Sequence, residues 1–194
     1  MPTIEEKKDE ELIALYIQGD ARALEMLIQR YLTPIYRYAL QFSGNADETE
    51  DITQETFLKF WKNIAKYKQG EKFSSWLFRI AHNAAIDHIR KRRFMPFSFF
   101  DRDEGNSIAD TLEDTEPLSD ELFARVESAR ALERYLQKLS PQHRAVLHLH
   151  YYEELPFIDI GRILGVPLDT AKSQHRRALF ALRKLIPNED APNW

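Results

Sequence analysis

The 194 residues contain no cysteine, only 6 glycines and no apolar run long enough to cross a bilayer. The lack of cysteine excludes disulfides, thiolate metal sites and cysteine nucleophiles. No glycine-rich loop is present, so nothing indicates a backbone cradle for phosphate. The first twelve residues are acidic and contain no apolar signal region. We therefore expect a cytoplasmic protein without membrane insertion.

Positive charge is scarce overall, because 27 lysines and arginines stand against 31 acidic residues and the net charge is −4. The charges are, however, segregated along the chain. Residues 79–93 and residues 168–185 each hold five basic residues against one acid, whereas residues 96–125 hold nine acids against two arginines. Local patches matter more for binding than the sum does. The pattern indicates two basic surfaces separated by an acidic connector.

Residues 156–185 have the pattern of two helices joined by a tight turn. Apolar residues recur at helical spacing in the first of them, and Gly165 provides the permissive backbone for a sharp stop. Pro167 blocks continuation of that helix and fits the first turn of the next. Gly161, one turn before Gly165, would let the second helix cross closely. The stretch predicts a helix-turn-helix.

The second helix of this pair, expected from about Leu168 to Leu185, has two different sides at about 100° per residue. The apolar side holds Ala171, Ala178, Leu179, Leu182 and Leu185, and the other side holds Lys172, Ser173, Arg176, Arg177, Arg183 and Lys184. Such a helix lies in the major groove of DNA, where Arg and Lys meet phosphates and guanine edges. DNA binding is favoured over the alternative, an ordinary helical hairpin whose basic side faces water.

The first half of the chain predicts four further helices, so an all-α fold is expected. Their ranges are residues 3–18, residues 20–42 with a kink or break at Pro34, residues 47–66, and residues 76–93 behind a cap at Ser74 or Ser75. In the third of these helices an apolar stripe most simply belongs to the core. The stripe consists of Phe57, Phe60, Trp61 and Ile64.

The carboxylates of the third helix, at Asp47, Glu48, Glu50 and Asp51, admit three interpretations. They form a solvated face, a metal site, or part of a face that docks a basic partner. No histidine joins them, so a metal site is disfavoured and no cofactor is expected. The docking face fits better, although composition alone does not decide it.

One sector of the fourth helix holds Trp76, Asn83, Asp87 and Arg90, with Arg79 beside it. Aromatic rings stack on unpaired bases, amides bond base edges, and Arg and Lys hold the backbone, so this set is suited to single-stranded nucleic acid. In the alternative interpretation Trp76 is a core residue. The basic run at residues 90–93 is then only a group of charges favoured by the helix dipole.

Residues 96–118 have the composition of an acidic, flexible linker, with prolines at both ends and Gly105 within. It would separate a first domain, residues 1–95, from a second, residues 119–194. The second domain is expected to begin with a helix from Ser119 to about Leu139. Ser140 and Pro141 then restart a helix with a cap and a proline at its first position.

Together these pieces resemble an extracytoplasmic-function (ECF) sigma factor, a group within the sigma-70 class of bacterial RNA polymerase subunits. Residues 47–61 (DETEDITQETFLKFW) and 73–93 (FSSWLFRIAHNAAIDHIRKRR) resemble the domain that binds core polymerase and melts the promoter. Residues 139–185 resemble the helix-turn-helix domain of the same family. The resemblance covers most of the chain in the right order, and it implies two small helical domains.

The resemblance also implies roles for the residues that match the family's motifs. Docking on the clamp helices of the largest polymerase subunit would involve Asp51, Gln54, Glu55, Leu58 and Trp61. Capture of the separated strand of the −10 element would involve Lys66, Lys72, Phe73, Trp76, Arg79, Asn83, Arg90, Lys91, Arg92 and Arg93. Reading of the −35 element would involve Thr170, Lys172, Ser173, Arg176 and Arg177.

The partners implied by the resemblance are core RNA polymerase, including the flap of its second-largest subunit, promoter DNA and an anti-sigma factor. The chain would have no enzymatic activity of its own, and its acidic linker would thread toward the RNA exit path. His175 departs from the family's pattern, because it stands in the apolar stripe of the recognition helix where an aliphatic residue is usual.

Two other functions are compatible with parts of the pattern. A helix-turn-helix repressor or activator with an N-terminal sensor domain would bind duplex DNA without core polymerase. A helical hydrolase would use the acids at residues 47–51, but the sequence offers no nucleophile–base pair and no complete ligand set. The sigma factor is therefore preferred.

Overall fold

The computed structural model describes residues 4–43, 45–68, 70–94 and 129–186, and within these ranges every regular element is a helix. The expected all-α class is thus confirmed for the described residues. The predicted linker at residues 96–118 lies outside them. None of the helices in these ranges is long and apolar enough to cross a membrane.

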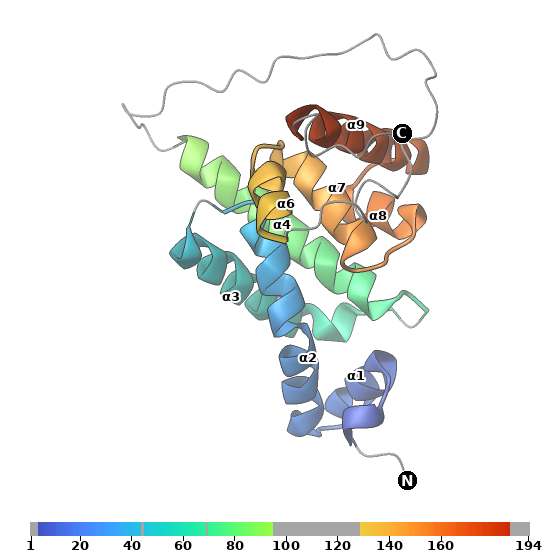
Figure 1. Ribbon diagram of the computed structural model, residues 1–194. Coiled ribbons are helices and arrows are strands. Elements are labelled where there is room, and N and C mark those ends of the chain that lie inside the picture. Colours follow the sequence, from blue (N-terminus) through green and yellow to red (C-terminus); the bar gives the residue numbers. More distant parts are fainter. Residues whose placement is uncertain (1–3, 44, 69, 95–128, 187–194) are drawn as a thin grey trace.

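The chain begins with a helical hairpin, the lowest part of the molecule in Figure 1. The helix expected at residues 3–18 is broken into a 3-10 turn, Ile4–Glu6, and α1, Asp9–Ile17, because Lys8 between them is extended. Asp20 caps α2, Ala21–Leu40, by accepting the Arg22 backbone N–H at 3.1 Å. Pro34 was expected to kink or break this helix, but it lies inside α2, which continues without a break. Buried side chains before and after it keep both halves of the helix against the core.

The next two helices pack on α2 to form the first domain. Asn45 caps α3, Ala46–Asn63, through a 2.8 Å bond from the Glu48 N–H, and a 3-10 turn, Ile64–Lys66, follows. Helix α4 spans Phe73–Phe94. The predicted caps Ser74 and Ser75 therefore lie inside its first turn, and their buried hydroxyls have no hydrogen-bond partner among the described residues. The cap prediction was wrong because Phe73, a fully buried side chain, already belongs to the helix.

The second domain contains α6, Ala129–Gln137, α7, Pro141–Tyr151, α8, Phe157–Leu164, and α9, Leu168–Leu185. Ser140 caps α7 by accepting the His143 N–H at 3.3 Å, as predicted. Gly165 ends α8 in the left-handed region at φ 69°, also as predicted. A Cβ on Gly161 would lie 2.8 Å from the Val166 carbonyl oxygen, so only glycine permits this tight turn.

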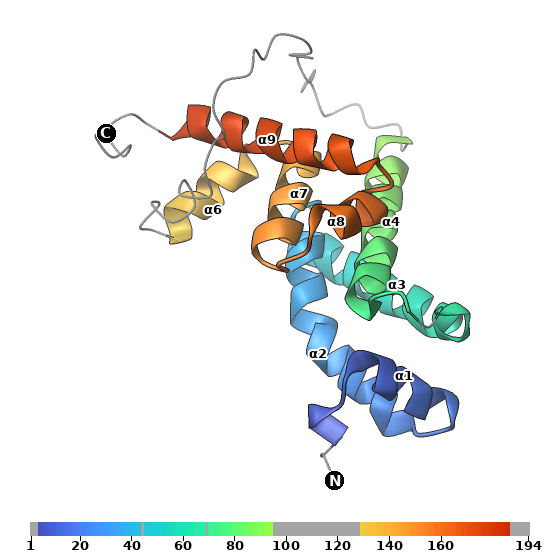
Figure 2. The same ribbon diagram turned by 90° about the vertical axis from the view of Figure 1, so that its right-hand side faces the viewer.

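The two domains are in contact, with α8 lying against α4 in both views (Figures 1 and 2). Arg144 on α7 donates from Nε and Nη2 to the backbone carbonyl of Gln41, at the end of α2, at 2.8 and 2.5 Å. Beside it the rings of Tyr38 and His148 lie 5.6 Å apart. An open groove of about 610 Å³ remains between α2 and α7, so the domains are not packed along their whole boundary.

Candidate nucleic-acid and protein interfaces

Helix α9 displays its basic side on the surface and buries the opposite one. Ala171, Ala178, Leu179 and Leu182 are buried, which matches the predicted apolar stripe. Of the residues predicted to read duplex DNA, Thr170, Lys172, Arg176 and Arg177 are exposed and Ser173 is half-buried. The structure therefore brings all five to one accessible side of the helix-turn-helix, where they can approach phosphates and base edges.

His175 belongs to an aromatic junction between α7, α8 and α9. Its Nε2 lies 3.2 Å from the Tyr151 hydroxyl, and its ring contacts those of His150 and Phe157 at centroid distances of 4.8 and 5.1 Å. The half-buried imidazole thus has both a polar partner and aromatic neighbours. The sequence did not reveal this arrangement, since Tyr151 stands 24 residues away.

The polar residues predicted to hold a single strand lie on α4, in the loop before it and at the end of the 3-10 turn Ile64–Lys66. Lys66, Lys72, Asn83, Arg90 and Lys91 are exposed, and Arg79 is half-buried. Arg92 and Arg93 belong to α4, but their side chains lie outside the described part of the structure. The guanidinium of Arg79 forms a 3.0 Å ion pair with Glu71, which lies in the loop.

Two predicted single-strand residues are core residues instead. Phe73 is fully buried and Trp76 is only 7% exposed, so neither ring offers a face to a base in this conformation. They pack with Phe60 and Tyr67 at centroid distances of 5.4–6.1 Å. The expectation that Trp76 stacks on an unpaired base is not met by this geometry, and the alternative, a core tryptophan, describes it.

One face of α3 carries the residues predicted to dock on polymerase. Asp51, Gln54, Leu58 and Trp61 are exposed and Glu55 is half-buried. Leu58 and Trp61 are each 53% exposed, so Trp61 does not belong to the core stripe in which periodicity placed it. Large apolar side chains beside carboxylates on an accessible face suit a protein partner better than water alone.

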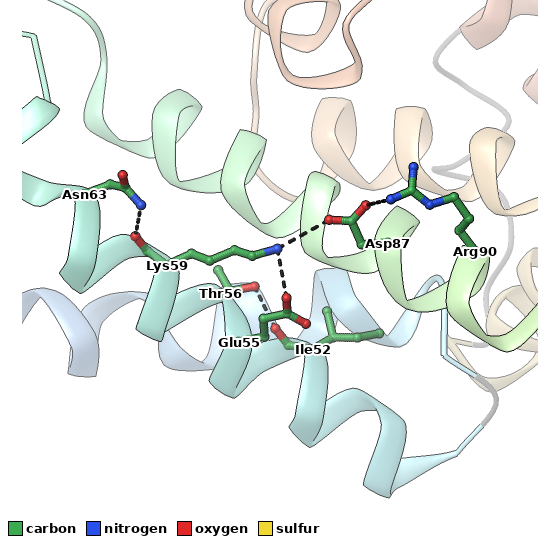
Figure 3. A network of polar contacts seen from close by, with 7 residues as sticks. All are labelled: Ile52, Glu55, Thr56, Lys59, Asn63, Asp87 and Arg90. Carbon is green, nitrogen blue, oxygen red and sulfur yellow. Dashed lines mark hydrogen bonds and ion pairs between the residues drawn. The ribbon is translucent and has the colours of Figure 1, made fainter.

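A lysine that sequence reasoning did not single out joins this face to α4 (Figure 3). Lys59 Nζ lies 2.9 Å from Glu55 and 3.5 Å from Asp87, and Asp87 in turn binds Arg90 at 3.0 Å. Burial lowers the pKa of Lys59, but the two carboxylates outweigh this effect, so its pKa lies above the ordinary value. The i, i+4 spacing of Glu55 and Lys59 was visible in the sequence, whereas the contact with Asp87 required the packing of α3 on α4.

Among the described residues, no group of three or more histidines and carboxylates is placed to hold a metal ion. Of the acids at the start of α3, Glu48 lies 3.8 Å from Nε2 of His88 on α4 and accepts a hydrogen bond from the Asn45 side chain at the helix start. Within the described ranges, α3, α4 and α9 provide exposed surfaces for binding.

Comparison with known proteins gives matches over both domains. Residues 27–95 match the family described as Sigma-70 region 2, and residues 135–184 match Sigma-70, region 4. The ECF RNA polymerase sigma factor SigW of Bacillus subtilis is 34% identical over 173 residues, which cover 87% of this chain and 91% of SigW. The ECF RNA polymerase sigma factor SigM of Mycobacterium tuberculosis is 30% identical over 93% of this chain and 86% of SigM.

Two solved structures share the fold. The sigma factor RpoE of Bartonella quintana, in complex with the anti-sigma factor NepR, has a TM-score of 0.62 at 23% identity, over 83% of this chain and 94% of RpoE. CnrH, in complex with the cytosolic domain of CnrY, has a TM-score of 0.63 at 24% identity, over 91% of this chain and 96% of CnrH.

Proposed function

This chain belongs to the ECF sigma factors of the sigma-70 class, and on that premise we propose how its surfaces divide the work of starting transcription. As a sigma factor it binds core RNA polymerase, directs it to promoters with −35 and −10 elements, and stabilises the melted strand. The first domain, residues 1–95, would hold polymerase and the melted strand. The second, residues 119–194, would hold duplex DNA.

The observation that carries the duplex-binding role is the separation of the two sides of α9. Its buried alanines and leucines fix the helix on the second domain, while Lys172, Arg176 and Arg177 stay exposed. A helix anchored along one stripe can place its opposite side in the major groove without unfolding. We assign the reading of the −35 element to this side, which includes Thr170 and Ser173.

Strand capture is assigned to the exposed polar residues of α4 and its preceding loop. Asn83 presents an amide to a base edge, while Lys66, Lys72, Arg79 and the run at residues 90–93 hold the backbone. Phe73 and Trp76, which are buried, would support the shape of this surface rather than stack on bases. Polymerase docking is assigned to Asp51, Gln54, Glu55, Leu58 and Trp61 of α3.

The remaining partners follow from the family. The sigma factor RpoE of Bartonella quintana, which shares this fold, forms a complex with the anti-sigma factor NepR, and we propose such an inhibitor for this chain too. The second domain would also contact the flap of polymerase, and the protein would act in the cytoplasm. Nucleotide addition would belong to the core enzyme, so this chain would catalyse no reaction.

In vitro transcription tests this function. Core polymerase is assayed with and without the chain over a library of promoter sequences, and start-site preference should appear only when the chain is present. A repressor or activator would instead bind duplex DNA tightly by itself and give core polymerase no preference. That outcome would end the sigma-factor proposal.

The same assay tests the strand-capture surface. Asn83→Ala should impair transcription from linear duplex templates, because the lost amide no longer holds an opened base. Capture of duplex through the second domain should stay unchanged. Full activity of this variant on both duplex and pre-melted templates would contradict the role of Asn83.

A further inference from the structure

The docking face of α3 contains a large aromatic side chain that water reaches. Trp61 and Leu58 are each 53% exposed, and their i, i+3 spacing places them side by side on the helix. Tryptophan is among the residues that contribute most to protein–protein binding. The orientation of the Trp61 ring therefore affects how well this face fits a partner.

The Trp61 ring is held in place by a residue outside α3. Its indole Nε1 donates a 2.9 Å hydrogen bond to the hydroxyl of Tyr16, which lies 45 residues earlier, on α1. A side chain on an exposed helix face ordinarily samples several rotamers. Here the polar edge of the Trp61 ring is hydrogen-bonded to α1, while part of its apolar surface remains accessible to solvent.

Tyr16 belongs to a helix that is itself firmly attached. Leu12 and Ile13 of α1 are buried against the core. Asp9, at the start of α1, forms an ion pair with Arg30 and accepts a 2.5 Å bond from the Tyr31 hydroxyl, both on α2. The acceptor for Trp61 is therefore on a fixed element, and α1 lies before the residues that match Sigma-70 region 2.

We propose that Tyr16 is a positioning residue for polymerase binding, whose hydroxyl fixes Trp61 in the orientation that meets the polymerase. The inference rests on the proposed docking role of α3. A ring that is already oriented loses less conformational freedom when the complex forms, and binding is tighter for that reason. Helix α1 then acts as a support for the docking face.

The alternative is that this hydrogen bond only ties α1 to α3. The two accounts differ in a double-mutant cycle, with affinity for core polymerase measured by competition against labelled wild-type chain. Tyr16→Phe removes only the hydroxyl, and Trp61→Phe keeps an aromatic ring but removes the N–H. Tyr152→Phe removes an exposed hydroxyl from the second domain and is the matched control.

If Tyr16 acts through Trp61, Tyr16→Phe weakens binding about three- to tenfold in the wild-type background and has no further effect beside Trp61→Phe. Tyr152→Phe should leave the affinity unchanged. An equal loss in both backgrounds would overturn the positioning role, because the effect would not pass through the indole.

Further variants separate this inference from the proposed function. If Trp61→Ala and Leu58→Ala weaken binding while Tyr16→Phe does not, α3 docks polymerase but Tyr16 plays no part. If Trp61→Ala and Leu58→Ala both leave the affinity unchanged, the docking face itself is assigned wrongly, and the role of Tyr16 fails with it.

Discussion

The two helices assigned to DNA, α4 and α9, have similar charge in the sequence, but their neighbouring acids lie in different places relative to the basic residues. Each stretch, residues 79–93 and residues 168–185, holds five basic residues against one acid. In α4, Arg79 is paired with Glu71 and Arg90 with Asp87, both at 3.0 Å. In α9 the one acid stands in the first turn, and Lys172 and Arg177 are exposed.

This difference suggests different energetics for the two binding events. Lys172 and Arg177 of α9 are exposed and can meet DNA phosphates, so binding by this helix should depend steeply on salt. Helix α4 has to exchange intramolecular carboxylates for phosphates, so part of its gain is offset by the ion pairs that break. The comparison can be tested with variants of α9 and with variants of α4.

The largest effect should come from removing the anchor of α9. Leu182 is buried in the stripe that holds this helix, and Leu182→Ala should lower the free energy of unfolding by about 2–5 kcal/mol. Denaturant unfolding measures the loss. The exposed neighbour provides the control, since Arg183→Ala should leave stability nearly unchanged. Equal stability of the two variants would contradict the conclusion that the buried apolar stripe holds α9 on the second domain.

Helix α4, by contrast, should be sensitive to acid through His82. This side chain is 9% exposed, its Nδ1 lies 3.0 Å from the Tyr38 hydroxyl, and burial lowers its pKa to about 4. The unfolded chain, with a pKa near 6.5, takes up the proton first. The contribution of His82 to stability should therefore decrease by about 3 kcal/mol as pH falls from about 6.5 to 4.

Chemical denaturation of the wild-type chain and of His82→Gln across this pH range measures the contribution of His82. The glutamine keeps a polar group beside Tyr38 but cannot titrate. The free energy of unfolding of the wild-type chain should therefore decrease relative to that of His82→Gln on acidification. Parallel stability curves would show that His82 does not carry this pH dependence.

A smaller effect, on promoter binding, is expected from removing single arginines, and it tests the comparison between α4 and α9 directly. Arg177→Ala should weaken promoter binding by about 1–3 kcal/mol if the guanidinium reads a guanine edge, and should reduce the salt slope by about one if it contacts phosphate. Arg79→Ala should reduce the slope less, because Arg79 already has Glu71 as a partner. Holoenzyme–promoter affinities over a range of salt concentrations measure both, and equal slopes would remove the distinction between α4 and α9.

The smallest expected effect is a gain. Glu71→Gln releases Arg79 from its half-exposed ion pair, which contributes about 0.2–1 kcal/mol. Holoenzyme should then bind a single-stranded −10 oligonucleotide a few-fold more tightly. Glu154→Gln, which removes an exposed carboxylate from the second domain, provides the control. Weaker binding by Glu71→Gln would mean that Glu71 orders the loop rather than competes with DNA.

Periodicity predicted those parts of the fold that depend on neighbours in sequence. The stripe of α9, the stop at Gly165 and the cap at Ser140 all depend on residues within one or two turns, and all three are found in the structure. The residues that the family resemblance assigns to DNA on α9 and to polymerase on α3 are exposed or half-buried, and their roles stay predictions.

Errors arose where the environment comes from distant segments. A helical wheel gives the side of α4 on which Trp76 lies, but not that Phe60 and Tyr67 cover that side. It likewise placed Trp61 in the core, although no element covers its ring completely. The contact between Arg144 and the carbonyl of Gln41 joins residues 103 apart, and nothing in the local pattern of either indicates it.

In the contact between Arg144 and Gln41 the acceptor is a main-chain oxygen. The contact therefore depends on where α2 ends and not on the side chain at position 41. Adding one residue to the last turn of α2 would move the terminal carbonyl by about 1.5 Å along the axis and about 100° around it. The length of α2 thus fixes where Arg144 of the second domain can bind. A single insertion or deletion at the end of α2 would break this contact, whereas most substitutions there would not.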